Sequence, residues 1–372
     1  MKKLFVIAAA VIALAACTKT EVNNTPDQAI AFQVANYVPQ TKAGETKFDE
    51  GKTFTTYAWF HPTSGAAQEF MANETVKWQE SAKQWSPERV YFWPKTGYVN
   101  FYSYAGTPAP VVTDGTATYT NKTIAITDDA MLASAAYRYS VANYDANEYS
   151  LQYGAANTDV KGVPTLFHHM LAQVSVIVKF DASDVADTKN SWDLIINSAS
   201  LIYKNSGSLT VTFTDPSSTG QAWPYDAAGY NWEPTGSNAT LAAAAGLGDV
   251  NKQTTAAPNV SEGVTLFDAV SVLPQDLTLA TGSDARFAIN YTLQHKYDGV
   301  NGIVETVNLT DEGDAPLGSI SLTDFTVETI NAWNMNHKYT YTVTIKPNKT
   351  VTFDPAVEAW EEKAAGYTYP ND

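Results

Sequence analysis

The stretch WSPERVYFWPKTGYVNFYSYAG, Trp85 to Gly106, contains eight aromatic residues among its 22 residues. The segment Pro94 to Gly97 is typical of a turn, because proline and glycine favour turn conformations. After this turn the residues alternate, which is the period of a β-strand. One predicted face carries Val99, Phe101, Ser103 and Ala105, and the other carries Tyr98, Asn100, Tyr102 and Tyr104. We interpret the aromatic residues as a hairpin and core of a β-sandwich rather than as a platform for sugars.

The same pattern of short apolar segments continues along most of the chain. These segments are rich in β-branched and aromatic residues, and Gly, Pro, Asn and Asp separate them, which is typical of antiparallel sandwiches. The predicted strands lie at 29–37, 52–61, 74–79, 90–93, 98–105, 122–127, 165–180, 191–203, 208–214, 264–274, 285–295, 303–309, 338–345 and 350–355. No sustained helical period appears, although residues 128–160 leave a short helix open. The predicted fold class is therefore all-β.

The length of the chain predicts more than one domain. A single core stops growing at roughly 250–300 residues, and this chain has 372. We place an N-terminal β-sandwich domain at 29–160 and a C-terminal β-sandwich domain at 161–372. Residues 215–262 show no clear period, and we expect them to form a surface excursion of the second domain.

The N-terminus has the pattern of an export signal. Lys2 and Lys3 precede the apolar run LFVIAAAVIALAA, and Leu14 to Cys17 read LAAC, the pattern of a bacterial lipobox. Cys17 is the only cysteine of the chain. We therefore predict a signal peptide at 1–16, a lipid anchor on Cys17 and a polar tether at 17–28. Two or more acyl chains would hold such a protein stably at a membrane. The alternative is an ordinary secretory signal with a chance cysteine.

Charge and motifs argue against several classes of function. The net charge of −16 offers no basic stripe for phosphates, so nucleic acid is not an expected partner. The chain contains no H-E-x-x-H, C-x-x-C, G-x-S-x-G or Walker motif, and we predict no enzyme, no cofactor and no metal site. His168 and His169 are adjacent in a predicted strand, so they should point to opposite faces, one near the core and one outside. The acidic segments Asp128–Asp129 and 310–316 are expected to be solvated turns.

Six segments in one order resemble a known family. They are the lipobox, AIAFQVANYVPQTKAG (29–44), the opening stretch, TLFHHMLAQVSVIV (165–178), VSVLPQDL (270–277) and NHKYTYTVTIKPNKTVTFDPAVEAWEE (336–362). This order resembles the fimbrillin-like surface lipoproteins of Bacteroidales bacteria, which are type V pilus subunits. The resemblance implies two tandem transthyretin-like antiparallel β-sandwich domains. It also implies export as a lipidated precursor to the outer membrane surface, where the mature subunit forms part of a fimbrium.

The resemblance further implies assembly by β-strand addition to other pilus subunits. In stalk subunits a trypsin-like protease removes the first strand, and the open groove accepts a strand from another subunit. In this chain the candidate exchanged strand carries Ile30, Phe32 and Val34. The candidate cleavage site lies between Lys42 and Ala43, although the family pattern has arginine there. An uncut anchor or tip role stays open, as does an ordinary solvated role for Lys42.

A second function stays open at this stage. An outer-membrane surface lipoprotein could bind glycans, and so a host or bacterial surface ligand, through exposed aromatic residues. The best candidates are Trp223, Tyr230 and Trp232, because the excursion around them offers the weakest case for a core role. The alternative is that these three residues pack the excursion onto its own domain.

Overall fold

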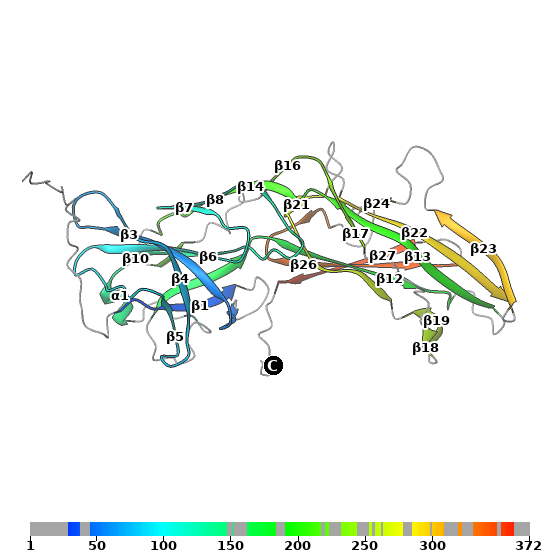
Figure 1. Ribbon diagram of the computed structural model, residues 1–372, viewed down its shortest axis with the longest axis horizontal. Helices are drawn as coiled ribbons and strands as arrows, with labels where there is room; N and C mark the ends of the chain where they lie inside the picture. The colour runs from blue at the N-terminus through cyan, green and yellow to red at the C-terminus, as the bar shows by residue number, and fades with distance from the viewer. Residues whose placement is uncertain are drawn as a thin grey trace, which may run out of the picture.

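The computed structural model shows an elongated, nearly all-β molecule (Figure 1). The early strands lie at one end, and β13, β22 and β23 reach the other end. The structure describes residues 29–37, 45–146, 151, 162–183, 190–216, 220–222, 232–243, 253–254, 257–261, 263–277, 285–297, 300–308, 319–321, 330–347 and 351–360. Among these residues the only helix is α1 (Val141–Ala146).

The strands fall into two groups along the chain. Those up to residue 169 are β1 (Phe32–Tyr37), β2 (Glu45–Lys47), β3 (Thr53–His61), β4 (Gln68–Gln79), β5 (Gln84–Pro87), β6 (Tyr98–Ala105), β7 (Val111–Thr113), β8 (Thr116–Thr123), β9 (Met131–Ala133), β10 (Ala135–Tyr139) and β11 (Val163–His169). Those after it are β12 (Ala172–Phe180), β13 (Asn190–Tyr203), β14 (Ser206–Thr212), β15 (Gly220–Ala222), β16 (Glu233–Thr235), β17 (Ala239–Ala242), β18 (Gln253–Thr254), β19 (Ala257–Ser261), β20 (Val264–Val272), β21 (Gln275–Asp276), β22 (Arg286–Tyr297), β23 (Val300–Asn308), β24 (Ser319–Ser321), β25 (Ala332–Trp333), β26 (His337–Ile345) and β27 (Val351–Ala359).

All strands of the first group except β7 and β8, together with β15 of the second group, form a sheet that closes on itself. Its order is β15-β10-β6-β3-β4-β5-β1-β11-β9, and β6 also pairs with β9. The path β6, β3, β4, β5, β1, β11 and β9 therefore returns to its start, which removes the free edges of these strands. The inside is an aromatic-rich core that includes Phe32, Phe48, Phe54, Phe60, Trp85, Trp93, Phe101 and Phe167. We call this set, with the other residues buried beside it, the N-terminal core.

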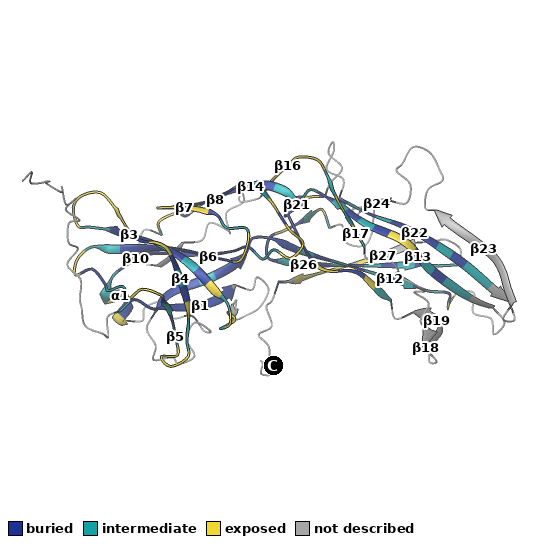
Figure 2. Ribbon diagram, viewed as in Figure 1, coloured by how far each residue is buried: buried dark blue, intermediate teal, exposed yellow. Residues whose placement is uncertain are grey.

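Two further sheets share a second core at the other end. One has the order β20-β12-β26-β27, and the other has the order β17-β13-β22-β23. Strand β12 alternates strictly between buried and half-buried residues, as the valine repeat predicts. Both sheets contribute to a cluster that contains Val174, Val176, Val178, Leu194, Leu201, Phe287, Leu293 and Val343. We call this cluster the C-terminal core. Figure 2 shows the buried residues along the strands and many of the exposed ones at turns.

A third cluster joins the two ends of the molecule. The sheet β16-β14-β8-β7 combines strands from both groups, because β14 pairs with β8. The junction cluster, as we call it, includes Tyr102, Tyr119, Met170, Leu171, Leu209, Trp232, Leu273, Met335 and Trp360. Distant parts of the sequence therefore meet in the middle of the molecule.

Several predictions about the strands need correction. The predicted strand 165–180 is two strands, and the chain passes from the closed sheet to the C-terminal sheets at the buried residues Met170 and Leu171. Residues 90–93 form no named strand. The sheets are not wholly antiparallel, because β1 pairs with β11 and β12 pairs with β26 in parallel. The division near residue 160 stays a prediction, although β11, which follows it, belongs to the closed sheet.

Candidate functional site

Strand β1 lies inside the closed sheet with neighbours on both sides. On one side it pairs in parallel with β11, from Phe32 opposite Val163 to Asn36 opposite Phe167. On the other side it pairs antiparallel with β5 at Phe32 and with β2 along its second half. Its backbone is therefore part of the continuous sheet, and its loss would expose two strand edges.

The side chains predicted to fill a groove do lie in the N-terminal core. Ile30, Phe32 and Val34 are 2%, 0% and 1% exposed. The ring of Phe32 lies 5.6 Å from that of Phe54 and 5.8 Å from that of Phe101, both in edge-to-face geometry. Such pairs add to the stabilisation that area burial alone provides. The alternation predicted from the sequence agrees with this burial, while the exchange of the strand stays a prediction.

The opposite face of β1 is buried as well, which the sequence analysis missed. Ala31, Gln33, Ala35 and Asn36 are all buried. The side-chain oxygen of Gln33 accepts a hydrogen bond from the backbone N–H of Leu151 at 2.9 Å. Because a buried polar group needs a partner, Gln33 fixes the strand's position as well as filling space.

One glycine permits the close approach of β11 to β1. A Cβ at Gly162 would lie 2.6 Å from the backbone nitrogen of Gln33 and 2.6 Å from the carbonyl carbon of Phe32. Real Cβ atoms do not approach backbone so closely. Glycine is therefore needed at position 162 because a side chain would not fit between β11 and β1, and not because of an unusual backbone angle.

The start of β1 is held by the segment that connects β5 to β6. The N–H of Ile30 donates to the carbonyl of Tyr91 at 2.8 Å, and Ala29 forms a bridge with Phe92. The hydroxyl of Tyr144, on α1, donates to the carbonyl of Ala29 at 3.2 Å. The chain is therefore held in place already at Ala29 and Ile30, before β1 begins at Phe32.

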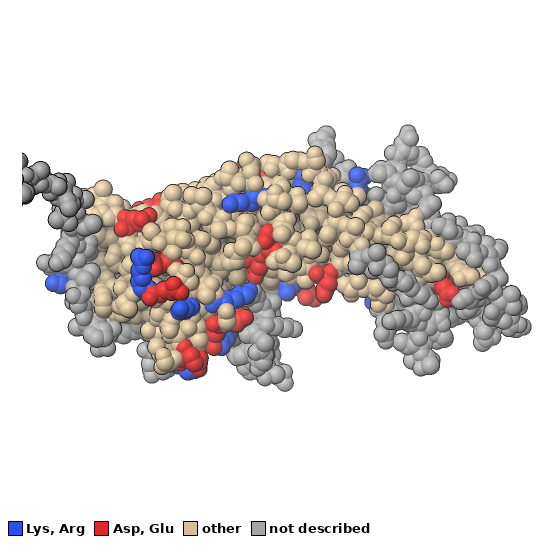
Figure 3. All heavy atoms as spheres, viewed as in Figure 1, with Lys and Arg blue, Asp and Glu red and all other residues tan. Residues whose placement is uncertain are grey.

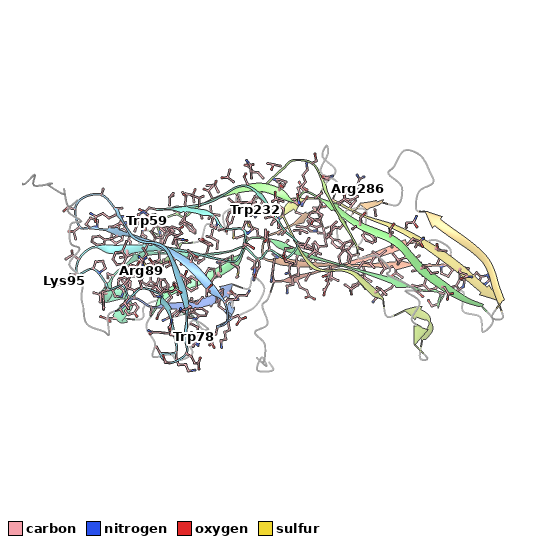
Figure 4. All side chains as sticks on the ribbon, in the orientation of Figure 1. Trp59, Trp78, Arg89, Lys95, Trp232 and Arg286 are labelled. Carbon is pink, nitrogen blue, oxygen red and sulfur yellow. The ribbon has the colours of Figure 1, made fainter. Side chains whose placement is uncertain are left out.

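A buried carboxyl group of β4 anchors this segment. The hydroxyl of Tyr91 donates to Glu74 Oε1 at 2.6 Å, and an Arg89 nitrogen lies 3.5 Å from the same oxygen. The side chain of Glu74 is 9% exposed and that of Arg89 is 79% exposed, and Figure 4 labels Arg89 beside β4. Burial, and then the hydrogen bond to Glu74, raise the pKa of the Tyr91 hydroxyl to about 12. The phenol therefore stays protonated and donates.

The predicted lipid anchor and cleavage residues, Cys17, Lys42 and Ala43, lie outside the described residues. In sequence, Lys42 and Ala43 fall between β1 and β2, which pair antiparallel. Among the described strands, β2 pairs only with β1. A cut between the two strands would therefore leave β1 without a covalent link to the strands that follow.

The predicted glycan contact at Trp232 is wrong in this structure. Trp232 is 3% exposed, and its indole N–H donates to the carbonyl of Met170 at 2.7 Å. Its ring lies 5.1 Å from that of Tyr119, inside the junction cluster (Figure 4). Packing across the junction, which a single sequence does not reveal, removes Trp232 from solvent. Trp223 and Tyr230 lie outside the described residues.

The two adjacent histidines also differ from the prediction, because both are buried. His168 Nε2 lies 3.1 Å from the Ser134 hydroxyl, and burial lowers the pKa of His168 well below its usual value. His169 Nδ1 lies 2.7 Å from Asp129 Oδ1, and its ring stacks on Trp360 at 4.2 Å. Since both faces of β11 are covered, neither histidine is outside.

Metal-binding groups and membrane-spanning helices are both absent from the described part of the chain. No three or more His, Cys, Asp or Glu side chains gather there in a way that could hold a metal ion. None of its helices is long and apolar enough to cross a membrane. On the face that Figure 3 shows, acidic and basic side chains lie side by side rather than in a stripe of one sign.

The chain is similar to a known protein family and to solved structures of fimbrial proteins. The model of the fimbrillin-like family matches residues 41–360. No curated protein matches significantly. A fimbrial protein from Bacteroides vulgatus is 18% identical with a TM-score of 0.45, over 90% of this chain and 100% of that one. The C-terminally truncated tip fimbrial protein Mfa3 from Porphyromonas gingivalis is 11% identical with a TM-score of 0.33, over 88% and 99%. The family match spans most of the sequence, and the chain therefore belongs to the fimbrillin-like family.

Proposed function

We propose that this protein is a structural and adhesive pilus subunit that assembles by exchange of its first strand, β1. Family membership supports a pilus-type adhesive subunit rather than an enzyme. The observation that carries the strand-exchange proposal is the position of β1. It is paired on both sides, its side chains fill the N-terminal core, and it precedes all other described strands. No other described strand could be separated from the fold by a single cut near the N-terminus.

The mechanism follows from what removal of β1 would leave behind. The departing strand would uncover a groove lined by aromatic residues of the N-terminal core and edged by β11 and β5. Unpaired strand edges and exposed apolar surface favour the addition of another strand. A strand from another subunit would restore the backbone hydrogen bonds and refill the pockets of Ile30, Phe32 and Val34.

The delivery and processing steps complete the proposal. The precursor would carry a lipid on Cys17 and reach the surface of the outer membrane as a lipoprotein. A trypsin-like protease would cut after Lys42, so that the assembled form starts at Ala43. An uncut anchor or tip role would keep the lipid. We also propose that the fold consists of two tandem transthyretin-like sandwiches. Of the three residues predicted to contact a glycan, the structure describes only Trp232, and its burial does not favour the glycan-binding alternative.

The test compares the mature parent with Lys42→Gln and with Lys95→Gln, a matched control at an exposed turn lysine. Each protein is treated with a trypsin-like protease, and its N-terminus and mass are measured by mass spectrometry and light scattering. We expect the parent and the Lys95→Gln control to gain an N-terminus at Ala43 and form oligomers. Lys42→Gln should stay monomeric. Oligomers of Lys42→Gln, or a cut parent that stays monomeric, would contradict strand exchange after this cut.

A further inference from the structure

We propose that residues 88–93, which we call the clasp, hold the start of β1 in its groove and set the rate at which the strand leaves. The inference rests on the proposed strand exchange and adds the element that controls it. The clasp supplies the only described strand-like contacts on the β5 side of Ala29 and Ile30. Because β1 ends at Tyr37, these contacts secure the end of the strand farthest from the proposed cut.

The clasp is fixed to the molecule at both of its ends. At one end the N–H of Glu88 donates to the carbonyl of Thr75 on β4 at 2.9 Å. At the other end Trp93 is fully buried, and its ring lies 5.2 Å from Tyr144 and 5.8 Å from Phe101. Between these points the segment forms no continuous strand, so its position depends on side-chain contacts.

The central contact is the one between Tyr91 and Glu74. Strand β4 has a bulge at Ala72 and Asn73, where both residues are exposed and Asn73 has a φ of 52°. The bulge shifts the alternation, so that Glu74 is buried on the strand instead of facing solvent. A buried carboxyl group is costly unless it is hydrogen-bonded, and Tyr91 is the donor that satisfies it.

The geometry connects this anchor directly to β1. Tyr91 donates to Glu74 through its hydroxyl and accepts from the N–H of Ile30 through its carbonyl. The ring of Tyr91 also packs 5.7 Å from that of Phe70. Loss of the hydroxyl would leave Glu74 with only the exposed Arg89, whose contact is longer at 3.5 Å. Tyr91 is thus a positioning residue for the start of β1.

The first measurement uses the uncut full chain and does not depend on strand exchange. Amide hydrogen exchange is followed at Ile30, and at Ala35 as an internal reference, because Ala35 has partners on both β2 and β11. In Tyr91→Phe we expect Ile30 to exchange about tenfold faster, since a hydrogen bond to a charged group is lost, while Ala35 is unchanged. Glu74→Gln should act in the same direction. Tyr98→Phe, at a half-buried position of β6, is the matched control.

The second measurement uses protein cut after residue 42. A labelled synthetic peptide of residues 29–42 is added, and its uptake is followed by fluorescence anisotropy. We expect uptake to be about tenfold faster in Tyr91→Phe than in the parent or in Tyr98→Phe. Equal Ile30 protection in Tyr91→Phe and the parent would overturn the clasp, and so would measurable peptide uptake at the same rate in both proteins. A parent that never takes up the peptide contradicts the proposed exchange, while the Ile30 measurement still decides whether the clasp holds the strand.

Discussion

Strands β1 and β12 are built alike but differ in how the chain holds them. Each has neighbours on both sides, and in each case one neighbour is parallel, β11 for β1 and β26 for β12. Each also carries buried residues at alternate positions that fill a core. Strand β12, however, continues from β11 and leads into β13, so covalent links at both ends keep it in place. Strand β1 is followed by a single connection to β2.

The difference shows that burial does not identify a strand that can be exchanged. By burial alone β1 is the more firmly held of the two, because both of its faces are covered while β12 buries one face and half-buries the other. What distinguishes β1 is connectivity, since one cut removes its covalent hold. After such a cut, packing and hydrogen bonds alone would determine whether it stays. The clasp contributes to these remaining interactions through its backbone contacts with Ala29 and Ile30.

The largest effect on stability is expected when a buried phenylalanine is replaced by alanine in either the N-terminal or the C-terminal core. Phe32 and Phe287 are both fully buried, one in β1 and one in β22. Phe32→Ala and Phe287→Ala should each lower the free energy of unfolding of the uncut protein by about 3–5 kcal/mol, measured by urea denaturation. After cleavage at Lys42 only Phe32→Ala should shorten the retention of β1, measured by gel filtration. Equal retention in both variants would show that the packing of Phe32 does not hold β1 in place after the cut.

A smaller effect is expected where β11 meets β1. Gly162→Ala would place a Cβ 2.6 Å from the backbone of β1 and should cost about 1–3 kcal/mol of folding free energy, as overpacking does. Gly51→Ala is the control, because its nearest neighbour is the end of the Asp49 side chain at 3.3 Å. Its effect should stay within about 0.5 kcal/mol. If the two variants unfold at the same urea concentration, the close approach at Gly162 is not needed to hold β1.

The sequence predicted the strands better than their partners. Alternating segments such as Thr53–His61 and Ala172–Phe180 appear as strands with alternating burial, because the period of two is local. The parallel partner of β1 lies more than a hundred residues away, and no local pattern specifies such a pairing. The second buried face of β1 and the role of Gly162 follow from that pairing, so they could not be predicted either.

Only the part of the candidate site that depends on local alternation could be predicted from the sequence. Ile30, Phe32 and Val34 were predicted as the core-facing residues of the first strand, from alternation alone. The clasp was predicted as a strand at 90–93, since Val90, Tyr91, Phe92 and Trp93 have high β-propensity. In the structure Val90 is exposed and Trp93 is buried, and only backbone contacts to β1 remain strand-like. The burial of Glu74 could not be predicted, because no sequence motif marks the bulge in β4 that buries this residue.

The smallest effect is expected from tyrosine ionisation, which lowers the stability of the fold only in alkaline solution. Burial raises the pKa of Tyr91 in the clasp, and of Tyr291 in the C-terminal core, from 10 to about 12. An unfolded chain would release these protons from about pH 10, so the folded state binds more protons between pH 10 and 12. The stabilisation is therefore complete below pH 10 and is lost as the pH rises through about 12.

The comparison of Tyr91→Phe with Tyr291→Phe tests whether both ends of the molecule respond in this way. Each substitution should make the loss of stability above pH 10 less steep, measured by urea denaturation at a series of pH values. Difference absorbance of tyrosinate between parent and variant should show ionisation near pH 12 in the folded protein. If Tyr91 or Tyr291 ionises at pH 10 while the near-ultraviolet circular dichroism shows that the protein is still folded, the hydroxyl of that tyrosine is not buried. Tyr91 contacts Glu74 and holds Ile30, whereas Tyr291 lies in the C-terminal core. Only Tyr91→Phe should therefore also change the amide hydrogen exchange of Ile30, which separates a local hold on β1 from a general loss of stability.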